Sequence, residues 1–304
     1  MELTRFADVH PFYAQAEDYL LTHEAHHNLV FGICTRLMEQ PEYAAQPPYF
    51  ALVHEAGAIV AAALMTPPHN LVLALARVDA ALKLIAADVR AFLPPPGVLG
   101  PQHESLTFAR IWQERTGQPY HLAKAERIYQ IEHVIPPRPV PGSLRPATEA
   151  DRELLIDWFH AFGVEALQED DDRAGQARNV DLRLRSPAVA NYFWEDGRPV
   201  SFTGALRGTP HGARIGPVYT PPAWRGRGYA SACVAAVSQV MLAEGRRFCF
   251  LFTDLANPTS NHIYQEIGYR PVADVDMYRF GSGWSPRSIA LDPITLRHVP
   301  RAMP

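Results

Sequence analysis

A turn rich in arginine and glycine, set between two apolar segments, is the part of this sequence best suited to bind an anion. The segment Val218-Tyr219-Thr220-Pro221-Pro222-Ala223-Trp224-Arg225-Gly226-Arg227-Gly228-Tyr229-Ala230 reads as a strand, a proline-rich break, a basic turn and the start of a helix. The first backbone N–H groups of a helix have no intrahelical acceptor and carry partial positive charge. Glycine lets such donors approach phosphate oxygens closely, and arginine adds forked donors. We therefore expect a diphosphate at residues 226 to 230.

A second polar motif follows after one predicted helix and one predicted strand. Residues 226 to 244 carry apolar side chains at helical spacing, and residues 248 to 252 form an apolar run of strand length. Asn257 is expected to cap a short helix that starts at Pro258 and stops at Gly268. Spacings of four and three residues place Asn257, Asn261 and Tyr264 on one stripe of that helix, which we expect to face a ligand.

Together the two motifs resemble the site of the GNAT acyltransferase superfamily. Arg225, Gly228 and Ala230 match its R-x-x-G-x-A signature, and the run from Asn257 to Tyr269 is similar to the other half of the site. The resemblance implies acetyl-coenzyme A as cosubstrate, with no metal. The implied coenzyme-binding residues are Val218, Tyr219, Thr220, Arg225, Gly226, Arg227, Gly228, Tyr229, Ala230, Asn257 and Asn261. The alternative is that the basic turn is only a solvated connection.

The resemblance also implies a reaction, the transfer of an acetyl group to a primary amine of a small molecule or peptide. In that chemistry a neutral amine attacks the thioester directly and Tyr264 protonates the leaving thiolate. The reference pKa of a phenol, about 10, lies above that of a thiol, about 8.5, so the phenol stays protonated at neutral pH. The alternative for Tyr264 is a packing aromatic.

The sequence does not show which residue accepts the proton of the amine. Asp254 and Glu195 are candidates, although either could instead hold a turn. Glu165 and the acidic run from Glu169 to Asp172 lie where such domains often cover the acceptor. They are expected either to attract a cationic amine or to form a solvated loop.

The length of 304 residues and the distribution of proline predict two domains, and the resemblance implies that they are of α/β (α+β) class. We expect two tandem GNAT-like domains, each with a twisted, mixed and mostly antiparallel sheet flanked by helices. The predicted parts are a degenerate amino-terminal domain (1–135), a proline-rich linker (136–142), a catalytic domain (143–281) and a carboxy-terminal tail (282–304). An unrelated α/β cap is the alternative for the first part.

The first half looks like a decayed copy of the second. Predicted hairpins lie at residues 49–64 and 191–207, and each half is expected to close with its own strand, at 128–131 and 277–280 respectively. At the expected phosphate turn the first half has Gly100-Pro101-Gln102-His103-Glu104. Proline lacks a donor and glutamate repels phosphate, so no coenzyme is expected there.

The composition and the amino-terminal residues indicate which partners and which cellular location to expect. The net charge is −4 and no block of lysine or arginine is present, so neither nucleic acid nor an anionic membrane is an expected partner. The amino terminus does not resemble a signal peptide, and we expect a cytoplasmic protein, monomeric or homodimeric. Cys34, Cys233 and Cys249 are expected to be reduced packing residues.

The sequence also allows two other classes of function, a zinc site and a regulatory module. His23, Glu24 and His27 fit the H-E-x-x-H pattern, in which a helix presents two imidazoles to zinc with a glutamate as base. Glu39 and Glu42 are third-ligand candidates by proximity alone. The chain could also be a regulatory module that binds acyl-coenzyme A without turnover.

Overall fold

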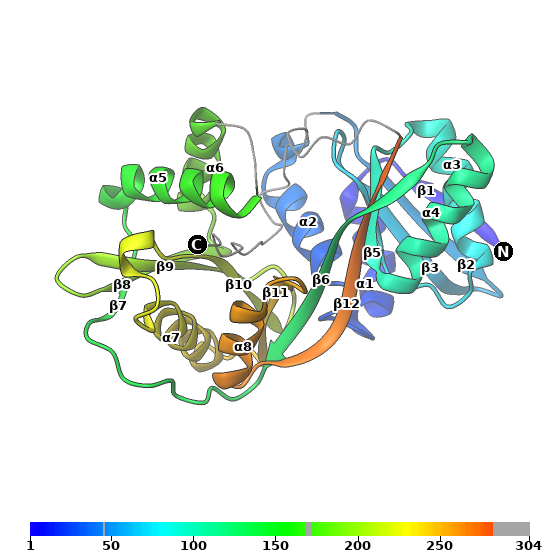
Figure 1. The fold of residues 1–304 in the computed structure, drawn as a ribbon. Coiled ribbons are helices and arrows are strands. Elements are labelled where there is room, and N and C mark those ends of the chain that lie inside the picture. Colours follow the sequence, from blue (N-terminus) through cyan, green and yellow to red (C-terminus); the bar gives the residue numbers. More distant parts are fainter. Residues whose placement is uncertain (45, 168–171, 282–304) are drawn as a thin grey trace. The chain divides into compact units, whose positions relative to one another are not determined.

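The computed structural model of the chain describes residues 1–44, 46–167 and 172–281, which separate into two compact units (Figure 1). Unit 1 comprises Met1–Arg127 and the described residues from Ala273 onward, and unit 2 comprises Ile128–Val272. The predicted tail at 282–304 lies outside the described residues. In the described part of the chain, no helix is long and apolar enough to cross a membrane.

Unit 1 is a mixed sheet with helices packed on it. Its strands follow the order β1-β2-β3-β4-β5-β12-β6, and β4 and β5 pair in parallel. The elements are β1 (Glu2–Phe6), α1 (Val9–Leu21), α2 (Asn28–Glu39), a 3-10 turn (Pro41–Tyr43), β2 (Tyr49–Glu55), β3 (Ala58–Met65), β4 (Leu71–Leu73), α3 (Ala80–Phe92), β5 (Gly97–Pro101), α4 (Gln102–Thr116), part of β6 (Tyr120–Ile131) and part of β12 (Arg270–Phe280).

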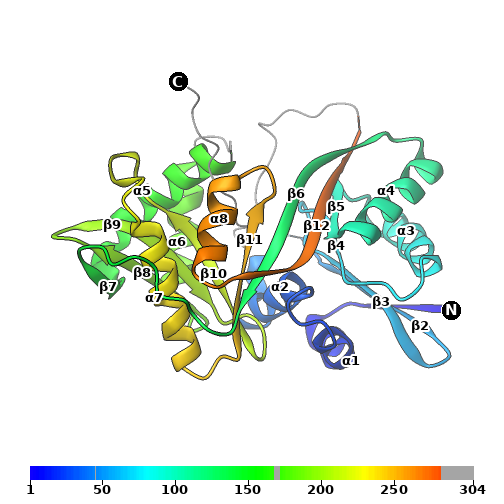
Figure 2. The ribbon, with the colours of Figure 1, turned by 60° about the horizontal axis from the view of Figure 1, so that its bottom comes forward.

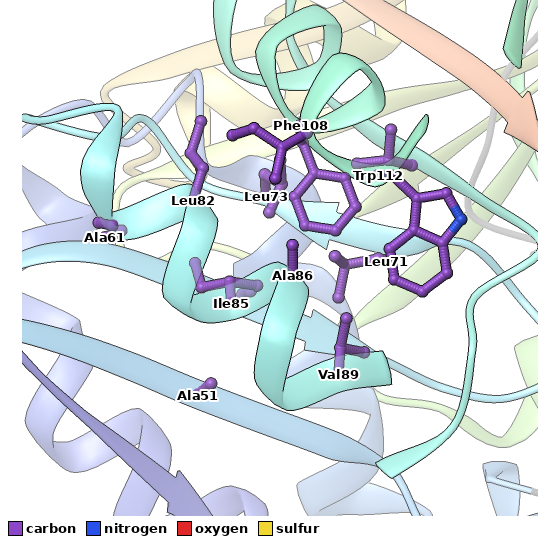
Figure 3. Close-up of a cluster of buried hydrophobic side chains, with 14 of the residues drawn as sticks. Ala51, Ala61, Leu71, Leu73, Leu82, Ile85, Ala86, Val89, Phe108 and Trp112 are labelled. Carbon is purple, nitrogen blue, oxygen red and sulfur yellow. The ribbon is translucent and has the colours of Figure 1, made fainter. Parts of the chain in front are cut away.

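The core of unit 1 forms where α3 and α4 lie on the sheet (Figure 3). The buried face of α3 presents Leu82, Ile85 and Val89 at helical spacing. Alanines such as Ala51 and Ala61 on the strands beneath leave room for the helix to approach closely. Burying side chains of the size of leucine or valine stabilises the fold by about 1.5–3 kcal/mol each.

Unit 2 is also a mixed sheet, with β11 and β10 parallel and the other recorded pairs antiparallel. Its order is β6-β11-β10-β9-β8-β7, with α5 and α6 on one face and α7 and α8 on the other (Figure 1). The elements are β7 (Ser143–Pro146), a 3-10 turn (Glu149–Asp151), α5 (Arg152–Phe162), a π-helical turn (Gly163–Leu167), α6 (Arg173–Arg185), β8 (Val189–Glu195), β9 (Pro199–Leu206), β10 (Gly212–Tyr219), a 3-10 turn (Pro222–Trp224), α7 (Tyr229–Ala243), β11 (Phe248–Asp254) and α8 (Pro258–Glu266).

The closing strands belong to the opposite unit from the one expected. Residues 128–131 of β6 lie in unit 2, where Tyr129 and Ile131 join the core under α7 and α8. Residues 273–280 of β12 lie in unit 1, where Met277 is paired with Leu99 of β5. The two units therefore differ from the predicted ranges 1–135 and 143–281. Strand partners far apart in the sequence are chosen by packing, which a local pattern does not reveal.

The residues between β6 and β7 (132–142), here called the β6–β7 segment, lie on unit 2 and are not a free connector (Figure 2). The Ile135 N–H donates to the Ile267 carbonyl at 2.9 Å, and the Pro141 carbonyl accepts from Trp194 Nε1 at 2.8 Å. A Cβ on Gly228 would lie 3.0 Å from Val140 Cγ1. The predicted linker is thus part of the surface beside the glycine turn.

All three cysteines are free and buried, as predicted for packing residues. Burial raises the thiol pKa of Cys233 and Cys249 to about 12 and that of Cys34 further, so none is a thiolate at neutral pH.

Candidate functional site

The basic turn forms the start of α7, as the sequence predicted. Gly226 and Gly228 have φ values of +75° and +84°, a region that disfavours side chains. Gly228 is the N-cap, so no side chain caps the helix, and the first turn of α7 contains no acidic residue. Acidic side chains are usually favoured at the start of a helix, where the partial charge is positive. At the start of α7 the neighbouring charged residues are arginines. This end of α7 is therefore electrostatically suited to an anionic ligand.

The side chain of Arg225 is held by two groups of unit 2. Its Nε donates to the Thr220 carbonyl at 2.8 Å, and its guanidinium pairs with Glu165 of the π-helical turn. The other oxygen of Glu165 accepts from the Tyr219 hydroxyl at 2.8 Å. Burial, followed by this hydrogen bond, raises the pKa of Tyr219. Glu165 thus joins the end of β10 to the basic turn. The sequence does not predict this link, because Glu165 and Tyr219 are 54 residues apart.

The end of β10 separates from its parallel neighbour. Recorded pairs between β10 and β11 run only from Gly212–Phe248 to Arg214–Phe250. On the other side, the register with β9 shifts between Ile215 and Val218, which places a bulge at Gly216-Pro217. Val218, Tyr219 and Thr220 therefore follow the last paired position on the β11 side. Tyr219 remains paired with Phe202 of β9, and the Thr220 and Ser201 hydroxyls are 2.8 Å apart.

The α8 motif begins as predicted, but Asn257 and Asn261 of its polar stripe form hydrogen bonds with backbone groups of unit 2. Asn257 Oδ1 accepts from the Ser260 N–H at 3.1 Å, which confirms the cap. Asn261 Nδ2 donates to the Asp254 and Asn257 carbonyls at 3.1 and 2.8 Å. These bonds hold the turn between β11 and α8, although the sequence predicts that the asparagines face a ligand.

Tyr264 is buried and does not lie on an open stripe. Its residue exposure is 2%, it belongs to the core between α7, α8 and the sheet, and its ring meets that of Tyr269 edge-on at 6.0 Å. Burial raises the pKa of Tyr264, so its phenol is protonated at neutral pH. The packing contact is observed, and the catalytic role stays a prediction.

Comparison with known proteins identifies the family. Residues 151–269 match the model of the acetyltransferase (GNAT) family. This part of the chain is a GNAT acetyltransferase domain. No curated protein matches the chain.

Solved structures extend the likeness to both units. A GCN5-related N-acetyltransferase from Sphaerobacter thermophilus has a TM-score of 0.60 at 16% identity, covering 94% of this chain and 98% of its own. A tandem GNAT protein from the clavulanic acid biosynthesis pathway has a TM-score of 0.56 at 11% identity, covering 93% and 100%. A GNAT acetyltransferase from Colwellia psychrerythraea has 0.56 at 10%, covering 92% and 99%. The chain has the fold of tandem GNAT-like domains.

The two candidate proton acceptors, Asp254 and Glu195, and Asp172 of the acidic run all have structural partners. Asp254 Oδ1 accepts from the Ala256 N–H at 2.8 Å, which makes it a turn residue. Glu195 pairs with Arg145. Asp172 caps α6 by accepting from the Gly175 N–H at 2.8 Å. Residues 169–171 of the acidic run lie outside the described residues.

The phosphate turn predicted for unit 1 at residues 98–104 is misplaced, because it precedes α4, which follows β5 as α8 follows β11. The counterpart of α7 is α3, since each of these helices connects two parallel strands, β4 to β5 and β10 to β11. The start of α4 is occupied by a carboxylate. Glu104 lies in the first turn of α4, is 5% exposed, and accepts from the Ala76 N–H at 3.0 Å. Pro101 is the N-cap and contributes no backbone donor. The carboxylate of Glu104 therefore lies at the start of α4, where the partial positive charge of the helix stabilises an anion.

The H-E-x-x-H pattern does not form a metal-binding helix. Residues 22–27 form turns between α1 and α2, and His27 uses both ring nitrogens on backbone groups. Its Nδ1 lies 2.8 Å from the Leu20 carbonyl, and its Nε2 accepts from the Leu75 N–H at 3.1 Å. No group of candidate metal ligands was found within residues 1–44, 46–167 and 172–281. His27 is a structural residue of unit 1.

The buried His27 predicts a loss of stability in acid. Burial lowers its pKa from 6.5 to about 4. Between pH 6.5 and pH 4 the His27 imidazole binds a proton in the unfolded chain but stays neutral in the folded chain. The contribution of His27 to the free energy of unfolding is therefore complete above pH 6.5 and decreases toward pH 4. We expect a contribution of up to about 1.4 kcal/mol per pH unit in that window. Denaturant unfolding of wild type and His27→Gln at several pH values measures it, and equal slopes for the two proteins would contradict it.

Proposed function

We propose that the protein is an acetyl-coenzyme A-dependent N-acetyltransferase that acts on a primary amine of a small molecule or peptide. The observation that carries the proposal is the start of α7, which has a glycine cap, no acid in its first turn and arginines on both sides of Gly226. Arg225 is paired with Glu165, so the positive charge left beside the helix start comes from Arg227 and from the unpaired N–H groups of α7, and it favours binding of an anion. The diphosphate of the coenzyme supplies that anion.

The separated end of β10 supports the placement of the pantetheine arm. Beyond Arg214 the recorded pairing with β11 stops, so the edge formed by Val218, Tyr219 and Thr220 is suited to hydrogen-bond an extended amide chain. Pantetheine carries two amides, and this edge would orient them toward the gap between β10 and β11. In this proposal the basic turn and the strand edge together bind the cosubstrate.

Tyr264 is the proposed proton donor to the leaving thiolate. In the reaction the amine nitrogen bonds to the thioester carbon, the C–S bond breaks, and the amine loses a proton as the sulfur gains one. The raised pKa of the buried phenol keeps it protonated but makes it a weaker acid than the thiol it would form. Its contribution is therefore mainly a hydrogen bond to the sulfur as negative charge develops.

Enzymatic assay of the purified protein tests the proposal. Acetyl-coenzyme A is incubated with panels of amino acids, polyamines, aminoglycosides and peptide amino termini, and release of free thiol is followed. We expect release with at least one panel and, by calorimetry, one coenzyme bound per chain. The turn before α3, the counterpart in unit 1 of the turn before α7, has no glycine and has the acidic Asp79 as its N-cap. Absence of binding would overturn the proposal, and binding without thiol release for any amine would indicate an acyl-coenzyme A-binding regulatory module.

A further inference from the structure

Two exposed arginines of unit 2 approach the same indole ring beside the basic turn. Arg198 follows the turn between β8 and β9, and its Cζ lies 5.8 Å from the ring centroid of Trp224. Arg227 belongs to the basic turn, and its Cζ lies 5.0 Å from the same centroid. The guanidinium groups of Arg198 and Arg227, which come from different segments, therefore both lie close to the Trp224 ring.

The neighbouring carboxylates are engaged elsewhere. Asp196 accepts from the Tyr229 hydroxyl at 2.7 Å, and Glu165 pairs with Arg225. In the described part of the chain neither Arg198 nor Arg227 has an ion-pair partner. A cation on a half-buried aromatic ring gains about 0.5–1 kcal/mol, which offsets part of the repulsion between the two guanidiniums. Arg227 also hydrogen-bonds the Tyr229 hydroxyl, and because each guanidinium has five donors, both arginines keep donors for a ligand.

Three contacts fix the hairpin that carries Arg198 next to the turn that carries Arg227. The bond from Tyr229 to Asp196 joins α7 to the hairpin turn. Trp194 of the same hairpin donates to Pro141 of the β6–β7 segment, whose Val140 lies against Gly228. The arginines are thus preorganised before any ligand binds, which lowers the entropy cost of binding.

We propose that Arg198 and Arg227, supported by Trp224, bind a second phosphate group next to the diphosphate site, namely the 3′-phosphate of the ADP part of the coenzyme. The inference rests on the proposed function, because the diphosphate at α7 brings this group to the same surface. A phosphate monoester carries nearly two negative charges and accepts bidentate hydrogen bonds, the interaction to which guanidinium is best suited. The pair of arginines therefore selects the complete coenzyme over its form without the 3′-phosphate.

Calorimetry with coenzyme A and 3′-dephospho-coenzyme A tests the inference. The proteins are wild type, Arg198→Gln, and Arg178→Gln as a control at an exposed arginine of α6. We expect wild type and the control to prefer coenzyme A by about 10-fold or more, the effect of one or two charged hydrogen bonds. Arg198→Gln should lose most of this preference through weaker binding of coenzyme A, with unchanged binding of the dephospho form.

The outcomes separate this inference from the proposed function. Equal binding of both ligands by wild type, or an equal loss for both in Arg198→Gln, would overturn the assignment of the arginine pair while the coenzyme site stands. Binding of neither ligand by wild type would overturn the proposed function and this inference with it.

Discussion

Gly228→Asp is expected to weaken coenzyme binding strongly. The new carboxylate would stand at the start of α7, where the diphosphate is proposed to lie, and would repel it. We expect a loss of at least about 1–3 kcal/mol, or roughly 10- to 100-fold in affinity. Calorimetry with coenzyme A measures the effect, and thermal unfolding verifies that the variant is folded.

Gly228→Asn is the matched control for this charge. The residue at 228 has φ +84°, and its Cβ would lie 3.0 Å from Val140 Cγ1, so both substitutions carry the same backbone and packing cost. Asparagine tolerates the left-handed region and is uncharged. Affinity should fall far less in Gly228→Asn than in Gly228→Asp. A folded aspartate variant with the affinity of wild type would refute the placement of the diphosphate.

Tyr264→Phe is expected to lower kcat by about 100-fold or more and to leave coenzyme affinity nearly unchanged. The substitution keeps the ring that packs on Tyr269 and removes only the hydroxyl. If Tyr264 donates to the departing sulfur, the loss appears in the chemical step and not in binding. Steady-state kinetics with the best amine from the thiol-release assay, combined with calorimetry, separates the two quantities.

Tyr269→Phe provides the comparison at a neighbouring phenol. Its hydroxyl lies 2.8 Å from the Ser238 hydroxyl in the same core, so its removal should cost about 1 kcal/mol of stability through a lost hydrogen bond. It should change kcat little. A similar fall of kcat in both variants would assign the effect to disturbed packing, and an unchanged kcat in Tyr264→Phe would leave Tyr264 as a packing residue.

The elements around the site were predictable because their signals are local. Asn257, Pro258 and Gly268 mark the limits of α8 through an N-cap, a fixed φ and a positive φ, each of which acts within a few residues. The start of α7 follows in the same way from Gly228. The predicted site in the second half accordingly lies on the expected elements.

The contacts that surround the site could not be predicted, since they join residues far apart in the chain. Glu165 reaches Tyr219 and Arg225, and Arg198 meets Arg227 on Trp224, through packing that no short pattern encodes. Burial also depends on the whole unit, which is why Tyr264 lies in the core and not on an open stripe.

The sequence by itself determined the basic, glycine-rich turn at Gly226 and Gly228, because charge and backbone freedom are properties of the residues themselves. It did not place the corresponding turn of unit 1, which the structure shows before α3 and not at residues 98–104. Tertiary structure alone decided which strand closes which sheet. β6 and β12 each run from one unit into the other. Strand pairing depends on contacts between segments far apart in the chain, and these contacts form only when the sheets pack.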